Sequence, residues 1–393
     1  MALKKKVASM VVDSKAQELS QLSSELHRNP ELGSEEFKAH ELLTNFLEKE
    51  GFTVERSYTG IETAFRATFG SGRPNVCVIC EYDALPEIGH ACGHNLIAEA
   101  GIAAGLGLKA ILEPSDASKG TVIVMGTPAE ETTGGKLNLI ENGAFNDIDI
   151  AMMVHPFPLN IVQPDFICSA TRIVTYTGKA AHAAAFPWEG VNALDAAVMA
   201  YTSISALRQQ MKPTWKVHGI ITNGGAKPNI IPEKAAMEYY IRAPTKTELV
   251  TLVEKVTSCF ESAALATGCQ VEINTPCADF LNIVHNPTLS DLYLKNLTEL
   301  GEKSTEMISD SPVKASTDMG NVSHVVPSIH PIYAIGSGEM NHTREFTAVT
   351  NTPEAHTATL TAAKAMAHTC IDVLTTSGLL EKIKHEKQTT NVS

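Results

Sequence analysis

Short apolar runs alternate with helix-like stretches through the first half of the chain. The runs cover residues 76–80, 121–125 and 148–154 and are apolar at nearly every position. Runs of that length are typical of strands that are buried on both faces of a sheet. The stretches between them, residues 97–112 and 134–143, carry apolar side chains at helical spacing. Strands that alternate with helices predict a parallel α/β sheet.

The stretch ahead of these runs predicts a helix followed by a hairpin. Residues 14–50 repeat apolar side chains at helical spacing, with a break near Pro30. Gly51 stands where a glycine commonly ends a helix. Residues 53–56 and 64–69 then have the composition of two strands, and the glycine turn that follows them favours a hairpin.

From about residue 168 the pattern changes to alternating strands and two long helices. The strands are expected at residues 170–177, 215–221, 235–241 and 271–274, and the helices at residues 192–209 and 246–266. This set predicts helices laid against an antiparallel sheet. We interpret residues 168–282 as an inserted α+β domain of ferredoxin-like type, and residues 1–167 with 283–393 as one discontinuous domain. The predicted fold class of that domain is α/β, with a parallel-rich sheet and helices on both faces.

Composition excludes several classes of partner. The 393 residues are 44% hydrophobic and 19% charged, which is ordinary for a globular protein. The net charge of −13 argues against nucleic acid and against an anionic membrane surface. The apolar run at residues 7–12 is too short for a secretory signal, and no segment of transmembrane length is expected, so a cytoplasmic protein is predicted. The cysteines form no paired C-x-x-C framework, which favours reduced thiols over disulfides.

Polar side chains follow each of the three buried strands. Glu81 and Asp83 follow the first, Glu130 and Glu131 follow the second, and His155 follows the third. In open α/β sheets, sites lie beyond the carboxyl ends of the strands. We therefore expect these side chains to meet at one edge of one sheet.

The residue types at this edge are those that bind metal ions. Thiolate, imidazole and carboxylate all bind zinc or a similar divalent ion. Gly93 allows the loop to turn the side chains on either side of it inward. A Cys-x-His pair alone is weak evidence, since a buried cysteine beside a surface histidine is more common. The strand-end residues favour the metal interpretation, with these candidate ligands: Cys92, His94, Glu131, His155 and, far downstream, His342.

The adjacent carboxylates Glu130 and Glu131 suggest a division of roles. Neighbouring side chains at a strand end point in different directions, so Glu131 can bind metal while Glu130 acts as general base on a water molecule. The alternative is a solvated acidic turn. Asp83 is placed to orient an imidazole through its N–H, although an Asx turn would use the same residue. A cysteine protease is disfavoured because Cys92 and a histidine only two residues away would have to pair.

Several motifs together resemble the M20 metallopeptidase family, which contains aminoacylases, carnosinases and amidohydrolases. The resemblance spans nearly the whole chain. It rests on the segments LHRNPEL at 26–32, HACGHN at 90–95, GTPAEE at 126–131, VH at 154–155 and GKAAHAA at 178–184. It implies a dinuclear metal centre, with zinc first and manganese or cobalt as alternatives. The ligands would be the five candidates above, with Glu130 as base and Asp83 as support.

The resemblance also implies that the inserted domain is a lid and a homodimerisation domain. His182 matches a histidine that stabilises the developing oxyanion, usually in the partner subunit's site, and Asn229 and Arg242 match substrate-binding positions. An arginine fits a substrate carboxylate through paired hydrogen bonds. Gly338 matches a glycine-bearing substrate loop, which favours the nearby His342 as the last ligand. Without the family resemblance, His182 would be interpreted as a surface histidine, Asn229 as a turn residue and Arg242 as a charge at a strand edge. The sequence alone would also rank His324, His330 and His356 equal to His342 as the last ligand.

Asn95 indicates the branch of the family. Proteins that hydrolyse auxin and hippurate conjugates usually carry Asp at this position, and Asn keeps the hydrogen bonding but loses the charge. The segments HACGHNLIA and EYDALPEIG are instead similar to the branch that cleaves β-alanyl-lysine-type dipeptides with a basic C-terminal residue. Within the loop, Glu81 and His90 are expected to be structural. We therefore expect a metallo-dipeptidase that binds a small dipeptide. The alternatives are an aminoacylase or amidohydrolase of acyl-amino acids and, in another class, a catalytically silent dimeric scaffold.

Overall fold

The chain folds into two units that are joined at two points along the sequence. The computed structural model describes residues 1–112, 120–304 and 315–390. Unit 1 comprises Met1–Asp165 and Ile283–Ser393, and unit 2 comprises Phe166–Asn282. The first junction therefore falls two residues before the position expected from the sequence.

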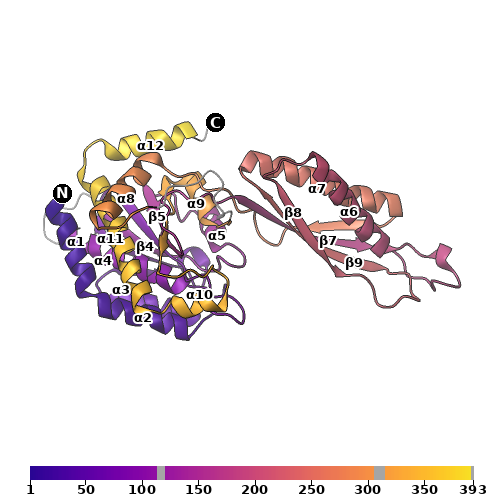
Figure 1. Ribbon diagram of the computed structural model, residues 1–393, viewed down its shortest axis with the longest axis horizontal. Coiled ribbons are helices and arrows are strands. Elements are labelled where there is room, and N and C mark those ends of the chain that lie inside the picture. Colours follow the sequence, from indigo (N-terminus) through magenta and orange to yellow (C-terminus); the bar gives the residue numbers. More distant parts are fainter. Residues whose placement is uncertain (113–119, 305–314, 391–393) are drawn as a thin grey trace. The chain divides into compact units, whose positions relative to one another are not determined.

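A six-stranded sheet forms the centre of unit 1, with helices around it (Figure 1). Strands β3, β4, β5 and β11 run parallel, and β1 and β2 form an antiparallel pair at one edge. The prediction of a parallel-rich sheet and of the β1–β2 hairpin is confirmed. In sheet order the strands are β1 (Thr53–Arg56), β2 (Phe65–Ser71), β4 (Gly120–Gly126), β3 (Asn75–Cys80), β5 (Ile150–Met152) and β11 (Ser328–Ile329).

A separate two-stranded sheet continues the chain after β5. It pairs β6 (His155–Phe157) in parallel with β12 (Ile332–Ala334). The predicted third strand at residues 148–154 therefore ends at Met152, and His155 opens a new strand. This short pair brings the late part of the chain beside His155.

The helices of unit 1 differ from the prediction mainly at the N-terminus. The expected helix at 14–50 is two helices separated near Pro30, because a proline disfavours helical backbone before it. Gly51 follows the second helix with φ +83°, as expected. A further helix, α1, precedes both. The helices are α1 (Ala2–Ser14), α2 (Ala16–Arg28), α3 (Phe37–Lys49), α4 (His94–Leu112), α5 (Gly135–Glu141), α8 (Pro287–Glu299), α9 (Met319–Val325), α10 (Arg344–Val349), α11 (Pro353–Thr375) and α12 (Leu379–Thr390), with a 3₁₀ turn at Tyr58–Gly60.

Helix α4 lies in the core of unit 1, where small residues let it approach the sheet. A Cβ at Gly101 would lie 2.5 Å from Cys80 Sγ and 2.8 Å from Ile79 O, so the close contact with β3 requires glycine. Contrary to expectation, α4 is long and apolar enough to cross a membrane, alone among the described helices. Because 83% of its apolar window is buried inside the fold, that length and composition are those of a core helix.

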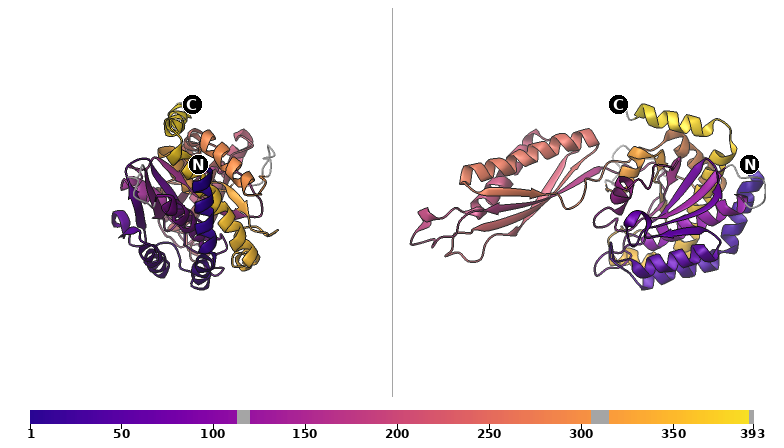
Figure 2. Two further views of the ribbon diagram at one scale, coloured as in Figure 1. Left: turned by 90° about the vertical axis from the view of Figure 1, so that its left-hand side faces the viewer. Right: turned by 180° about the vertical axis from the view of Figure 1, so that it is seen from behind.

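Unit 2 is a four-stranded antiparallel sheet with two helices on one face (Figures 1 and 2). The sheet order β10-β7-β9-β8 with a β-α-β-β-α-β sequence is the ferredoxin-like arrangement that was predicted. Alternate residues of β9 are buried against the helices, which form a second hydrophobic core. The elements are β7 (Cys168–Thr177), α6 (Ala193–Leu207), β8 (Lys216–Asn223), β9 (Lys234–Ala243), α7 (Lys246–Thr267) and β10 (Gln270–Asn274), with 3₁₀ turns at Pro187–Glu189 and Arg208–Gln210.

Candidate metal centre

The side chains that follow the buried strands meet at one edge of the unit 1 sheet, as expected. Asp83 lies at the centre of this edge and is completely buried. Its Oδ1 is 2.9 Å from His94 Nδ1, and its Oδ2 accepts a hydrogen bond of 2.9 Å from the backbone N–H of Glu131. Asp83 thus orients the imidazole and also holds the loop after β4, which is the supporting position proposed for it.

The five candidate ligands form two groups that share Cys92. The first group contains Cys92, His94 and His155, and the second contains Cys92, Glu131 and His342, with potential ligand atoms in each group within 4.8 Å of one another. Cys92 Sγ is 3.3 Å from His155 Nε2, and His342 Nε2 is 3.5 Å from Glu131 Oε1. One thiolate between two sets of donors suits a pair of ions.

Two buried atoms of this cluster indicate that it is built for a cation. His94 Nε2 and Glu131 Oε1 are buried and have no hydrogen-bond partner among the described residues. Buried polar atoms are almost always paired, and an unpaired one needs an explanation such as an ion. The chemistry of the donors and these two orphaned atoms therefore fit a dinuclear metal centre.

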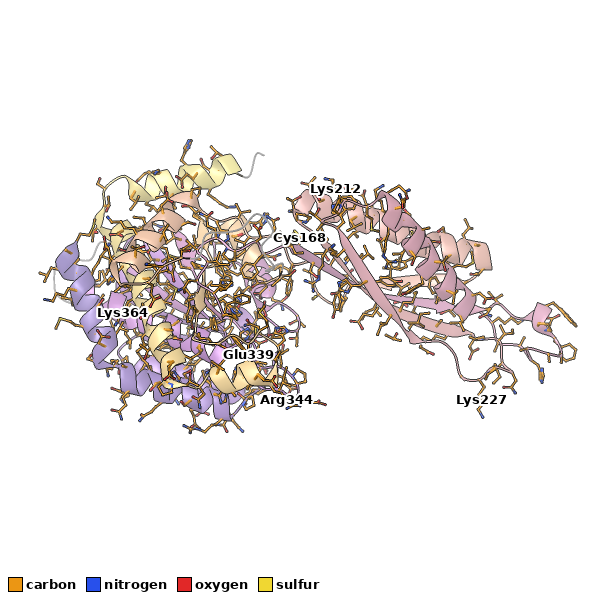
Figure 3. All side chains as sticks on the ribbon, in the orientation of Figure 1. Cys168, Lys212, Lys227, Glu339, Arg344 and Lys364 are labelled. Carbon is orange, nitrogen blue, oxygen red and sulfur yellow. The ribbon has the colours of Figure 1, made fainter. Side chains whose placement is uncertain are left out.

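His342 is carried to the cluster by a strained, well-anchored segment. Its backbone has φ +68°, which is uncommon for a residue with a side chain, and its N–H donates to Ala91 O at 2.9 Å. Asn341 donates to both Cys92 O and Pro156 O at 3.2 Å. Glu339 and Arg344, labelled in Figure 3, flank this segment. Strain of this kind persists where surrounding contacts impose it, often at functional sites.

The three rival histidines lie outside the potential ligand groups. His330 is buried edge-on against His155, with 5.8 Å between ring centroids. His356 pairs with Glu99 at 2.7 Å, and His324 lies on α9. Among the described residues, no potential ligand group contains any of the three. Proximity therefore favours His342, which the sequence could rank first only through the family resemblance.

The backbone of the loop at residues 90–95 depends on Gly93. Its φ is +83°, and a Cβ there would lie 2.5 Å from Pro156 Cγ. Glycine both allows the turn and leaves room for the strand that begins at His155. Ala129, just before Glu130, also has a positive φ of 60° and donates its N–H to Glu36 at 2.7 Å. Both ligand-bearing loops are therefore held in conformations that few residues adopt.

Asn95 has a structural role that explains the amide. Its Nδ2 donates to Ser23 Oγ at 3.0 Å and to Thr350 O at 2.9 Å, and all of Asn95 is buried. An aspartate could not donate to the Thr350 carbonyl and would place a charge beside it. The amide links α2 and α4 to the end of α10 behind the ligands. The loss of charge noted in the sequence thus serves a backbone contact.

A second charged cluster, which the sequence pattern did not predict, lies beside the ligands. Lys136 on α5 is fully buried and forms ion pairs with Glu81 and Asp318. Glu81 Oε2 is also 3.5 Å from His94 Nε2, so the expectation of a purely structural Glu81 needs correction. Glu81, Glu130 and Asp318 each bring one carboxylate oxygen within 4.8 Å of the others. Glu81 and Glu130 had a local signal in the sequence, their positions after β3 and β4, whereas Lys136 and Asp318 had none.

The electrostatics of the cluster follow from burial and crowding. Burial, together with the carboxylates of Glu81, Glu131 and Asp318, raises the pKa of Glu130 well above its ordinary value. Burial also raises the pKa of the Cys92 thiol. Burial opposes the charged form of His94, but Asp83 and Cys92 outweigh it and raise its pKa. In its ionised form, a Glu130 carboxylate with a raised pKa is a stronger proton acceptor than an ordinary glutamate.

The candidate residues outside this cluster occupy two regions. Gly338 lies in the segment before His342, and a Cβ added to it would have no atom within 4 Å. In unit 2, His182 and Asn229 are adjacent, because Ala183 N–H donates to Asn229 O at 3.1 Å. His182 Nδ1 accepts from the N–H groups of Ala184 and Ala185 at 3.3 and 3.2 Å, which leaves its Nε2 to carry the ring proton.

Arg242 lies at the other end of the unit 2 sheet. Arg242 lies near the end of β9, where it pairs with Ser169 close to the first junction. The other end of β9, at Lys234, is the end that lies toward His182. Arg242 lies eight positions after Lys234 along the strand, which corresponds to roughly 26 Å. Arg242 stacks over Tyr240, with 5.9 Å from Cζ to the ring centroid. The unit 2 candidates therefore do not form one cluster within a single chain.

Several known proteins are similar to this chain along nearly its whole length. Residues 169–267 match the family model of a peptidase dimerisation domain. The chain is 48% identical to the Xaa-Arg dipeptidase of Mus musculus over 98% of this chain and 92% of that protein. It is 30% identical to one of the subunits of the p-aminobenzoyl-glutamate hydrolase of Escherichia coli, over 96% and 93% of the two chains. In structure it resembles a dinuclear metal binding peptidase of the M20 family from Bacillus subtilis, with TM-score 0.68, 20% identity and 92% and 99% coverage.

The fold and the donor set define a metallopeptidase. The extent and identity of the sequence matches show that the chain belongs to the M20 peptidase family. The family resemblance stated from the sequence is thereby confirmed.

We expect metal binding to weaken as the pH falls. The pKa values of Cys92 and His94 are both raised, so protons compete with a metal for these two ligands. Each displaced proton changes the affinity by about tenfold per pH unit. Competition with a chromophoric chelator between about pH 6 and about pH 8 measures this slope. An affinity that does not change with pH would contradict the assignment of these two ligands.

Proposed function

We propose that this protein hydrolyses the amide bond of small dipeptides with a basic C-terminal residue, of the β-alanyl-lysine type. The observation that carries the proposal is the near full-length match to the Xaa-Arg dipeptidases of Mus musculus and Homo sapiens, at 48% and 47% identity. The cluster of Cys92, His94, Glu131, His155 and His342 supports it, because every ligand expected for a working centre is present.

In this proposal the protein side chains divide the work of hydrolysis. A pair of divalent ions, when bound, would lower the pKa of a water molecule and act as a Lewis acid that polarises the amide carbonyl. Glu130 accepts the proton of the attacking water and returns it to the leaving amine. Asp83 keeps His94 in the tautomer and orientation that a ligand needs. His182 donates its Nε2–H to the developing oxyanion, and Arg242, Asn229 and Gly338 contribute to substrate binding.

The donors favour zinc over harder ions. A thiolate and several imidazoles suit zinc, and manganese and cobalt are the alternatives that the same ligands accept. The identity of the ion is part of the proposal, so the substrate panel is run with all three metals.

The arrangement of unit 2 supports the proposal of a homodimer through that unit. Strand β8 is an edge strand, and α6 exposes Val198, Met199 and Tyr201. His182 and Asn229 lie roughly 26 Å or more from Arg242 along the sheet, which is longer than a dipeptide. One chain therefore cannot place all three on the same dipeptide, which favours a contribution from a second copy. We propose that His182 serves the site of the partner subunit.

A second candidate function is the hydrolysis of acyl- or aryl-acyl amino acids. The 30% identity to the p-aminobenzoyl-glutamate hydrolase chain favours it, together with matches of 28% identity to N-acetyldiaminopimelate deacetylases from Streptococcus suis. The silent-scaffold alternative has no comparable support, because no candidate ligand or base is missing from the chain.

A substrate panel tests the proposed function. Purified protein is assayed with zinc, manganese and cobalt on β-alanyl-lysine, β-alanyl-ornithine, an Xaa-Arg dipeptide, acetyl-amino acids and an aryl-acyl glutamate. We expect kcat/KM to be highest for the dipeptides with a basic C-terminal residue. Glu130→Gln, purified in parallel, measures any contaminating hydrolase. Turnover of the acylated amino acids alone would replace the proposal with the second candidate.

The neighbouring substitutions Glu130→Gln and Glu131→Gln separate base from ligand. We expect Glu130→Gln to keep both metal ions but to lose about two to four orders of magnitude in kcat. Glu131→Gln should instead lose metal affinity, and excess metal should restore part of its activity. Metal analysis by plasma mass spectrometry is paired with steady-state kinetics. Near-normal turnover of Glu130→Gln would contradict its role as base.

Mixing two inactive variants tests the role of His182 across the dimer. His182→Ala and Glu130→Gln each impair every site of their own homodimer. If His182 acts in the partner's site, each mixed dimer contains one complete site, and random reassortment restores about a quarter of the activity of the unaltered protein. The variants are mixed after partial unfolding and refolding, and each variant refolded alone is the control. A mixture no more active than its components would place His182 in its own chain's site or outside the reaction.

A further inference from the structure

A carboxylate trio lies directly beside the candidate ligands, and two of its members pair with a buried lysine. Glu81, Glu130 and Asp318 contribute one oxygen each, all within 4.8 Å of one another. Lys136 Nζ lies 2.7 Å from Asp318 Oδ1 and also pairs with Glu81 Oε1. All of the Lys136 side chain is buried, so its ammonium has no access to water.

Lys136 is held in place from two directions. Its ammonium contacts Asp318 Oδ1, and its backbone N–H also donates a hydrogen bond to Asp318 Oδ2 at 3.0 Å. Asp318 immediately precedes α9, and Glu81 immediately follows β3, so the ion pairs join three elements that are distant in sequence. The ammonium therefore occupies a defined position among the oxygens.

That position is one in which a divalent cation could bind. Several carboxylate oxygens around one point are the ligands that magnesium, manganese and calcium prefer. Here a protein cation contacts two of the three carboxylates. The lysine thus takes the place that a hard metal ion would otherwise have in this trio.

Glu130 belongs to two potential ligand groups, so the occupancy of one group affects whether Glu130 is free to act as base. It groups with His94 and Glu131 on one side and with Glu81 and Asp318 on the other. A general base needs a free carboxylate oxygen, which a metal on the second group would occupy. Because Lys136 already binds Glu81 and Asp318, these two carboxylates are not available to bring a metal onto Glu130.

We propose that Lys136 is a built-in cation that excludes a third metal ion from the Glu81–Glu130–Asp318 trio and so keeps Glu130 free to act as base. Lys136 is in this respect a positioning residue of the metal centre, acting through its two carboxylate partners. The inference rests on the proposed dinuclear centre, and it explains why the centre would bind two ions and not three.

A purely structural role for the lysine is the alternative, and the chain offers a matched control. Lys5 is also buried, and its ammonium contacts Asn296 Oδ1 at 2.7 Å and Asp372 Oδ2 at 2.8 Å. That network joins α1, α8 and α11 and belongs to no potential ligand group among the described residues. Lys5→Met and Lys136→Met therefore both remove a buried ammonium, but only one borders the metal centre.

The experiment counts metal ions in the unaltered protein, Lys136→Met, Lys5→Met and the double variant Lys136→Met/Asp318→Asn. Each is equilibrated with excess Mn²⁺, desalted and analysed by plasma mass spectrometry. We expect Lys136→Met to rise from about two ions per chain to about three, and the other proteins to remain at about two. In Lys136→Met alone, kcat should fall as the Mn²⁺ concentration is raised, with little change in KM.

Each other outcome has a defined meaning. A folded Lys136→Met that holds two ions, with kcat independent of Mn²⁺, would overturn the proposal. If this variant unfolds at low Mn²⁺, refolding by added Mn²⁺ supports the proposal, since a metal then replaces the ammonium. Failure to fold at every Mn²⁺ concentration, while Lys5→Met folds, counts against it. Fewer than two ions in the unaltered protein would instead refute the dinuclear centre, and this inference with it.

Discussion

The metal centre depends on one buried carboxylate that makes two hydrogen bonds. Asp83 holds the His94 imidazole with one oxygen and the backbone of Glu131 with the other, both at 2.9 Å. These two ligands come from different loops, one after β3 and one after β4. A single aspartate thus sets the distance between them, and its burial removes competition from water. The rest of the cluster is arranged around that contact.

Burying so much negative charge requires cations within the fold. The cluster contains Glu81, Glu130, Glu131 and Asp318 besides Asp83, and an unpaired carboxylate in such a place is strongly disfavoured. The ammonium of Lys136 balances the charge of Glu81 and Asp318. Divalent ions, when bound to the ligands, balance the remaining negative charge. The result is a centre in which Asp83 contacts His94, Glu131 lies near His342, and Glu81 and Asp318 share Lys136. These different surroundings give the carboxylates different roles.

Much of this arrangement could be predicted from the sequence because it is local. Apolar runs identified the buried strands, and parallel strands bring their carboxyl ends to one edge of a sheet. That rule placed Asp83, Glu131 and His155 together from the sequence alone. It failed for Lys136 and Asp318, which are 182 residues apart and follow no strand of the predicted set. A lysine at the start of a short helix has no local feature that distinguishes it from a surface residue.

The sequence by itself determined the buried strands, the two-unit organisation and the types of donor, since these follow from periodicity and from residue chemistry. Tertiary structure decided which of four late histidines, His342, meets Glu131, because only contacts across the fold separate it from His324, His330 and His356. It also decided that Glu81 lies in the charged cluster, where the pattern had suggested a structural residue. In each case the deciding partner lies far along the chain, where no local pattern can specify it.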